Sequence, residues 1–210
     1  MNPFNEKTAR VDDLRLDLRN PRMPDDHFGS EEEAIEYLAQ HAALEELVES
    51  IGSSGWFDYE PLVVLSSEGD QHNIVIEGNR RLAVLRLLRD EDLAKRLGVR
   101  LPSPVHADAI PETVKVWEVA HRRDARDFIG FKHINGAFKW DSFAKAKYAA
   151  EWLDEDPDVA AVSRRLGDTH NTVVRLVNGY RVLRQSERQG FDREKLPRRF
   201  AFSHLYTALT

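Results

Sequence analysis

The spacing of hydrophobic and polar positions changes along the chain, and the change predicts strands mainly in the first half. Apolar and charged residues alternate over Leu14–Leu18, which is typical of a short half-buried strand. Two apolar runs, Pro61–Leu65 and Asn73–Ile76, flank a turn signal at Glu68–Asp70 and together predict a hairpin. Val114–Val119 is rich in valine and predicts a further strand.

Helical spacing accounts for most of the remaining chain. Ser30 and Glu33 have the spacing of a capping box, and helical periodicity then runs to Ile51, as one or two helices, before Gly52 and Gly55. Further helices are expected at Leu82–Leu88, Asp124–Ile134, Asp141–Leu153, Val159–Leu166 and Asn171–Leu183, whereas Lys95–Pro111 is expected to be irregular.

This order of elements predicts an α+β fold: a small mixed sheet with helices, followed by an all-α bundle. We expect one domain over residues 1–122 and a helical domain over residues 123–210. The last apolar pattern, from Phe200, stops about two helical turns later, so we expect more protein beyond Thr210.

Composition restricts the class of protein. Hydrophobic residues make up 41% of the 210 residues, which is enough for a packed core. The absence of cysteine excludes disulfides and thiolate metal sites and fits a reducing, cytoplasmic setting. The start of the chain has no apolar run like that of a signal peptide, and no stretch approaches the roughly 20 apolar residues of a membrane helix.

Charge is unevenly distributed along the chain. The net charge is −6, yet residues 160–210 contain ten Lys or Arg and four Asp or Glu. The preceding residues are therefore acidic, and only the basic end is suited to phosphate contacts. A solvated basic helix face without a ligand is the alternative.

The segment Glu77–Arg81 is the most informative motif. A predicted strand ends, Gly78 turns the chain, and a helix begins with Arg80 and Arg81. A helix start offers free N–H groups and partial positive charge, and guanidinium groups match phosphate oxygens. Cations are unfavourable at this end of a helix, so the placement favours a binding function. An ordinary strand–helix junction with exposed arginines is the alternative.

The order and spacing of several motifs resemble the ParB N-terminal domain of the ParB/sulfiredoxin superfamily. The matching segments are Arg19–Arg22, Leu44–Ile51, Gly55, Pro61–Val64 and Gly78–Arg81, then Phe131–Asn135 and Ala160–Leu176. The resemblance implies a nucleotide pocket for CTP or ATP with Mg²⁺, a DNA-binding helix-turn-helix and a homodimer. The nucleotide-binding residues that it implies are Arg19, Arg22, Gly78, Asn79, Arg80, Arg81, His133 and Asn135, with Asn135 also a metal ligand.

Two departures concern the metal. Asn79 replaces the glutamate of the family's Gly-Glu-Arg-Arg box, and no glutamate precedes Asn135. Magnesium prefers anionic oxygens, so these departures weaken the case for it. Glu77 is similar to the aspartate of Asp-Gly-x-x-Arg motifs in other members of the superfold. It is our candidate metal ligand and catalytic base, with a purely electrostatic role beside Arg80 as the alternative.

The segment from Val159 to Leu176 fits a helix-turn-helix. Ala160, Val162 and Leu166 are expected to face inward, with Val173 and Leu176 packing the second helix against them. The expected DNA-binding residues are Arg164 and Arg165 at phosphates and Thr169, His170, Asn171, Thr172 and Arg175 in the major groove. A structural three-helix bundle is the alternative.

These observations favour a nucleotide-responsive, DNA-binding protein of plasmid partition, regulation, or mobile-element or phage-defence type. A metal-dependent ParB-like nuclease, NTPase or phosphotransferase using Glu77 is a second hypothesis, and a scaffold with a decayed pocket is a third. Sulfiredoxin chemistry is excluded because it requires a cysteine nucleophile.

Overall fold

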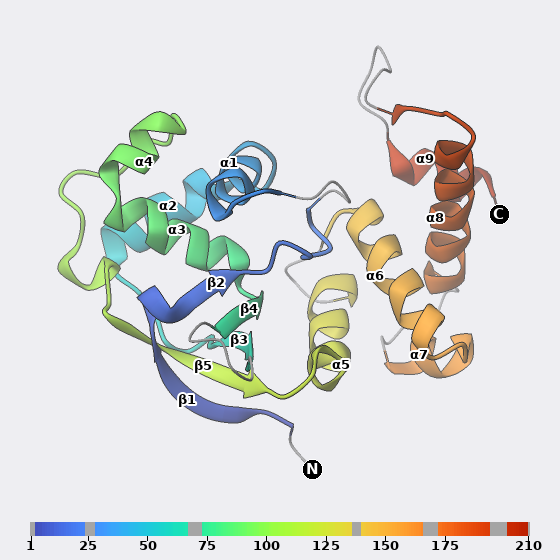
Figure 1. Ribbon diagram of the computed structural model, residues 1–210, viewed down its shortest axis with the longest axis horizontal. Helices are drawn as coiled ribbons and strands as arrows, with labels where there is room; N and C mark the ends of the chain where they lie inside the picture. The colour runs from blue at the N-terminus through green and yellow to red at the C-terminus, as the bar shows by residue number, and fades with distance from the viewer. Residues whose placement is uncertain are drawn as a thin grey trace. The chain divides into compact units, whose positions relative to one another are not determined.

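The computed structural model describes residues 3–23, 28–66, 73–135, 140–165, 172–193 and 201–209. The chain divides into two compact units, Met1–Ala125 and Arg126–Thr210, each of which has its own arrangement of elements (Figure 1). None of the described helices is both long and apolar enough to cross a membrane.

The first unit contains a mixed sheet, as expected for the α+β class. Its described strands are β1 (Asn5–Arg10), β2 (Leu14–Leu16), β3 (Leu62–Leu65), β4 (Asn73–Glu77) and β5 (Thr113–Val119). The strand order is β1-β5-β3-β4-β2. β1 pairs with β5 and β3 with β4 in antiparallel fashion, whereas β3 with β5 and β2 with β4 are parallel. The prediction of a small mixed sheet is therefore confirmed.

Helices gather on one face of this sheet (Figure 1). They are α1 (Glu31–His41), α2 (Leu44–Ser54), α3 (Asn79–Arg89) and α4 (Glu91–Arg96), with 3₁₀ turns at Val11–Asp13, Ala107–Ala109 and Arg122–Ala125. Most residues of α3 are buried, which makes it the central helix of the core. Ser30 caps α1, because its hydroxyl accepts from the Glu33 N–H at 3.2 Å. The Glu33 carboxylate accepts from Gly29 N, at 2.7 Å, one residue before the position that a capping box requires.

Three differences from the sequence prediction have simple causes. Strand β1 was missed because nearly all of its residues are exposed, so it has no apolar alternation and is held by backbone pairing with β5. Helix α4 was missed because six residues are too few to reveal a helical period. Strand β2 ends at Leu16, two residues early, because turns begin at Asp17. The predicted hairpin turn at Glu68–Asp70 lies outside the described residues.

A polar group, which we call the Asp17 cluster, ties these elements together: the buried Asp17, Asn20 and Asn79, and the partly exposed Arg122. Asp17 is 2% exposed, and its carboxylate accepts two N–H bonds from Arg122, at 2.5 and 2.7 Å. The Asp17 N–H donates to Asn79 Oδ1 at 2.8 Å, and the Asn20 N–H donates to the Asp17 carbonyl at 3.0 Å. One carboxylate therefore links the turn after β2 with the segment after β5, and its own N–H reaches α3.

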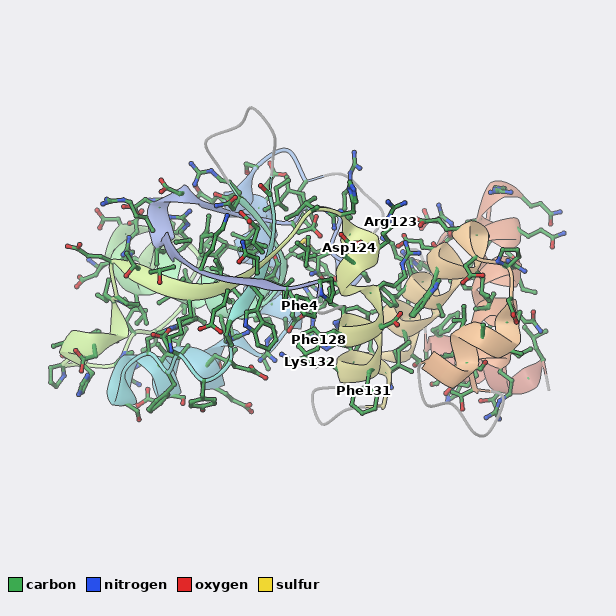
Figure 2. All side chains as sticks on the ribbon, turned by 90° about the horizontal axis from the view of Figure 1, so that it is seen from below. Phe4, Arg123, Asp124, Phe128, Phe131 and Lys132 are labelled. Atoms are coloured by element: carbon green, nitrogen blue, oxygen red, sulfur yellow. The ribbon has the colours of Figure 1, made fainter. Side chains whose placement is uncertain are left out.

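The second unit is helical. It contains α5 (Arg126–Gly130), a π-helical turn (Phe131–Asn135), α6 (Ser142–Glu155), α7 (Val159–Arg165), α8 (Thr172–Arg188) and α9 (Phe202–Ala208). The single helix predicted over Asp124–Ile134 is thus a 3₁₀ turn, a short α-helix and a π-helical turn in succession. Figure 2 shows Phe128, Phe131 and Lys132 projecting from this stretch, with Lys132 Nζ 5.9 Å from the centroid of the Phe128 ring.

The core of the second unit contains apolar residues of both expected helices, α7 and α8. Val162 of α7 and Val173 of α8 are fully buried in one cluster with Trp152 of α6, as their apolar spacing predicted. Leu176 is also buried. Ala160 was expected to face inward but is exposed, because α7 turns Val162 toward the cluster and leaves its first turn at the surface. Leu166 lies outside the described residues.

We predict that Arg122→Ala lowers the free energy of unfolding by about 2 kcal/mol, since it leaves the buried Asp17 carboxylate without its bidentate partner. Urea denaturation would measure the change. The control is Arg123→Ala, whose side chain is 69% exposed, and it should change stability by less than about 0.5 kcal/mol. Equal effects of the two variants would show that the Asp17 ion pair contributes nothing specific.

Candidate functional site

The junction between β4 and α3 is built around Gly78. This residue has φ +103°, and a Cβ there would collide with Leu62 Cδ2, so only glycine fits. A glycine N-cap has no side chain to accept the first N–H groups of α3, and the first turn contains no acidic residue. The positive end of the helix dipole is therefore left without the usual side-chain compensation.

Asn79 holds this helix start in place. It is 5% exposed, and its Oδ1 accepts from Asp17 N. Its Nδ2 donates to the Val75 carbonyl of β4 at 2.6 Å. Both ends of the amide are thus engaged within the protein, which makes Asn79 a residue that positions the helix start.

Arg80 reaches across to the connection between α1 and α2. Its Nη2 donates to the carbonyl of Ala43 at 2.8 Å, and Ala43 itself has a left-handed backbone, φ 47°. The Nε atom of Arg80 is buried without a hydrogen-bond partner. Burial lowers the pKa of Arg80, and the negative charge of Glu46 acts in the opposite direction.

Arg81 folds back against the loop between α2 and β3. Its Nη1 donates to the carbonyl of Glu60 and lies 3.6 Å from the Glu60 carboxylate. Its guanidinium carbon lies 5.9 Å from the centroid of the Trp56 ring. Nη2 is buried without a hydrogen-bond partner, close to where a Cβ on Gly78 would be.

The electrostatics of this helix start favour an added anion. Burial is the largest influence on the pKa of Arg81 and lowers it, while Glu60 and Glu77 oppose the shift. Two partly desolvated guanidinium groups thus stand at the positive end of α3, and each has a buried nitrogen without a partner. A phosphate oxygen would compensate charge and donors together.

Glu77 ends β4 opposite Val63 of β3 and is 7% exposed. The negative charge of its carboxylate opposes the lowering of the Arg81 pKa, so the end of β4 interacts electrostatically with the first turn of α3. Among the residues that the structure describes, no three His, Cys, Asp or Glu side chains are grouped to hold a metal ion. Metal binding by Glu77 remains a prediction.

The two prolines of residues 19–24 predict extended or turn geometry in an exposed arm that carries Arg19 and Arg22. The structure has turns here, but part of the segment is buried. Asn20 is 6% exposed and Met23 1% exposed, and the Met23 N–H donates to the Asn20 carbonyl at 2.9 Å. The Arg19 and Arg22 N–H groups donate to the side chains of Asp17 and Asn20, each at 3.0 Å. These side-chain acceptors fold the segment into turns. Arg19 is exposed and Arg22 half-buried.

The other expected pocket residues, His133 and Asn135, belong to the second unit. Both lie in the π-helical turn Phe131–Asn135, a geometry often found at functional sites. His133 is 5% exposed and stacks on Trp140, with ring centroids 4.3 Å apart and an interplanar angle of 4°. The side chain of Asn135 lies outside the described residues.

The expected DNA-binding residues are described only in part. Thr172 begins α8, and Arg175 is half-buried in its first turn. Arg164 and Arg165 end α7, but their side chains lie outside the described part of the chain, as do Thr169, His170 and Asn171. The predicted DNA contacts therefore stay predictions.

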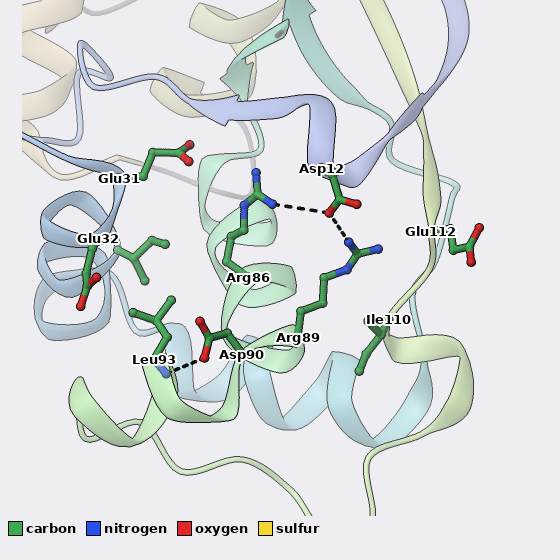
Figure 3. A pocket seen from close by; sticks show the side chains of 10 residues that line it. Asp12, Glu31, Glu32, Arg86, Arg89, Asp90, Leu93, Ile110 and Glu112 are labelled. Carbon is green, nitrogen blue, oxygen red and sulfur yellow. Dashed lines mark hydrogen bonds and ion pairs between the residues drawn. The ribbon is translucent and has the colours of Figure 1, made fainter. Parts of the chain in front are cut away.

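A hollow of about 620 Å³ lies at the other end of α3 (Figure 3). Arg86 and Arg89 line it: Arg86 donates to the Leu14 carbonyl at 2.6 Å, and Arg89 donates to Asp12 at 2.5 Å, while Arg89 Nε is buried without a partner. Sequence patterns did not predict this hollow, because its lining comes from four separate segments.

Four residues around the helix start were also missed from the sequence: Asp17, Arg122, Trp56 and Glu60. The role of Asp17 could have been predicted, because an aspartate side chain often accepts the backbone N–H of the residue two positions later, in an Asx turn. The other three contact the site from loops far along the chain, and no local pattern marks them.

Comparisons with known proteins give distant likenesses. No protein-family model matches the chain, and no curated protein matches it. The chain is similar to the C-terminally truncated chromosome-partitioning protein ParB from Caulobacter crescentus complexed to the centromeric parS site, at 14% identity and a TM-score of 0.41, over 84% of this chain and 71% of that one. It is also similar to the same protein complexed with CTP-gamma-S, at 14% identity and a TM-score of 0.33, over 97% and 91% of the two chains. Function must therefore be argued from the residues of the site.

We predict that Gly78→Ala destabilises the protein by about 3 kcal/mol, from the left-handed backbone and the collision with Leu62. Gly98→Ala is the matched control, since Gly98 also has positive φ, +67°, but no atom lies within 4 Å of an added Cβ. It should cost about 1 kcal/mol from the backbone alone. Unfolding curves with equal shifts for both variants would contradict the tight packing at the helix start.

Proposed function

We propose that the chain is a nucleotide-binding and DNA-binding protein that holds the triphosphate of CTP or ATP at the start of α3. The observation that carries this proposal is that two consecutive arginines at a glycine-capped helix start each hold a buried guanidinium nitrogen without a partner, Arg80 Nε and Arg81 Nη2. Arg89 Nε is also buried without a partner, but it belongs to a single arginine at the other end of α3, where Arg89 pairs with Asp12. Structural arginines usually satisfy their buried nitrogens within the protein. The resemblance of Gly78–Arg81 to the phosphate-binding box of ParB proteins supports the same assignment.

In this proposal the backbone N–H groups of the first turn of α3 and the two guanidinium groups donate to phosphate oxygens. Gly78 lets α3 begin without a capping side chain, which leaves these N–H groups available to the phosphates. Arg81 now donates to the carbonyl of Glu60, so a phosphate would either add to that contact or replace it. Arg19 and Arg22, in the turns beside Asp17, supply further positive charge to the ligand.

Magnesium would be bound mainly by the phosphates. Mg²⁺ commonly takes one or two carboxylates from the protein and its remaining ligands from phosphate and water. Glu77, at the end of β4, is the carboxylate that we assign to it. The metal would screen the negative charge of the triphosphate.

DNA binding is assigned to the second unit. Residues 160–210 have a net positive charge, and Val162, Val173 and Leu176 are buried as a helix-turn-helix requires. We propose that Arg164 and Arg165 bind phosphates and that the start of α8, with Thr169–Thr172 and Arg175, reads the major groove. The chain would act as a homodimer in plasmid partition, regulation, or a mobile-element or phage-defence system.

Nucleotide binding should raise thermal stability. At a concentration about 100 times Kd, CTP or ATP with magnesium should raise the Tm of the full chain by roughly 5–10 °C. The double variant Arg80→Gln, Arg81→Gln should lose this increase, because it removes both guanidinium groups. Differential scanning fluorimetry with CTP, ATP, GTP and UTP checks the result.

The control is Arg96→Gln, an exposed arginine of α4 paired with Glu32, which should respond to nucleotide like the parent. The double variant also removes the contact between Arg81 and Glu60, which supports the fold. The single variant Arg80→Gln keeps that contact and should still lose most of the increase in Tm with nucleotide. If no nucleotide raises the Tm of the parent, the nucleotide proposal is wrong.

DNA affinity should depend on salt. The double variant Arg164→Gln, Arg165→Gln should bind every DNA sequence more weakly, and the slope of log K against log salt should fall by about 0.9 for each phosphate that the two arginines neutralise. Fluorescence anisotropy at several salt concentrations measures the slope. Arg181→Gln, an exposed arginine of α8 paired with Asp154, is the control and should keep the parent slope. An unchanged slope in the double variant would show that these two arginines do not contact DNA phosphates.

A further inference from the structure

Two aromatic rings are exposed in the loop between α2 and β3. Phe57 is 49% exposed and Tyr59 83% exposed, and their ring centroids lie 5.6 Å apart at an interplanar angle of 36°. Single exposed apolar residues are ordinary, but two neighbouring rings offer a continuous aromatic surface to solvent. We call Phe57 and Tyr59 the ring pair.

The loop that carries the ring pair is anchored at Trp56, the residue before Phe57. The Trp56 N–H donates to the Asp108 carbonyl at 2.9 Å, and the Trp56 indole N–H donates to Asp58 Oδ1 at 2.8 Å. Gly55, at φ +90°, turns the chain into the loop beside Asp108. A surface fixed before the ligand arrives costs little entropy when it binds.

The same loop lies against the proposed phosphate site. Arg81 contacts both Trp56 and Glu60, which bracket the ring pair in the sequence. Tyr59 lies close enough to Arg81 to act electrostatically on its pKa. The ring pair therefore lies next to the first turn of α3, which carries the two guanidinium groups of the proposed phosphate site.

We propose that the ring pair is a stacking surface for the base of the nucleotide whose phosphates bind at the start of α3, a proposal that rests on the function proposed above. Every base presents an aromatic face, and stacking on an exposed ring tolerates different bases. The outer face of Tyr59 is the more accessible of the two and would take the base. The phosphates would then give charge recognition, and the loop would distinguish a nucleotide from a bare polyphosphate.

Isothermal titration calorimetry of the full chain with CTP, ATP and inorganic tripolyphosphate, each with magnesium, tests this proposal. Tyr59→Ala and the double variant Phe57→Ala, Tyr59→Ala should weaken binding of at least one nucleotide by about tenfold or more. Their affinity for tripolyphosphate should be unchanged, and Tyr59→Phe should restore nucleotide binding. The control is Ile110→Ala, an exposed apolar residue lining the hollow at the other end of α3, which should change neither affinity (Figure 3).

The outcomes separate this inference from the function on which it rests. If nucleotides and tripolyphosphate bind the parent and the ring variants equally well, the stacking surface is wrong and the phosphate site stands. If the ring variants lose tripolyphosphate as well, the rings support the loop and do not stack on a base. If the parent binds neither ligand, both proposals fail, and a protein partner is the remaining occupant for the ring pair.

Discussion

Gly78 turns the chain through the left-handed region, and the Leu62 side chain fills the space where a Cβ would lie, so both the backbone and the packing require glycine here. Because of this constraint, α3 begins directly at the end of β4 with no side chain to cap it. The helix start keeps its partial positive charge, and the sequence then adds two arginines there. For stability alone this combination is unfavourable, and it is consistent with a helix start kept for an anionic ligand.

The Asp17 cluster gives this helix start a fixed position. Asn79, the first residue of α3, bonds to Asp17 N on one side and to the Val75 carbonyl on the other. The Asp17 carboxylate binds Arg122, which follows β5. Buried polar groups that are fully bonded specify one arrangement of the elements they join. A phosphate site made of backbone N–H groups requires such a fixed arrangement, because its donors cannot adjust as side chains do.

The sequence predicted the parts of the fold whose patterns are local. Strands β3 and β4 and helix α3 followed from apolar runs, and the strand–glycine–helix junction followed from Glu77–Arg81. Contacts between distant segments were not predictable. Nothing in the sequence near Arg81 indicates Glu60 or Trp56. The prolines around Arg22 predicted an exposed arm, whereas Asn20 and Met23 on either side of it are buried. The π-helical turn at Phe131–Asn135 has the same apolar spacing as an α-helix over so short a length.

The central claim is that the first turn of α3 binds polyphosphate through its backbone. It is tested most directly by ¹H–¹⁵N NMR of the full chain during a titration with tripolyphosphate and magnesium. The account predicts saturable shifts of the Asn79, Arg80 and Arg81 amide signals, with smaller changes at Leu93 and Ala94 in α4. Amide signals of the first turn that stay in place, while the ligand shifts other signals or none, would contradict it.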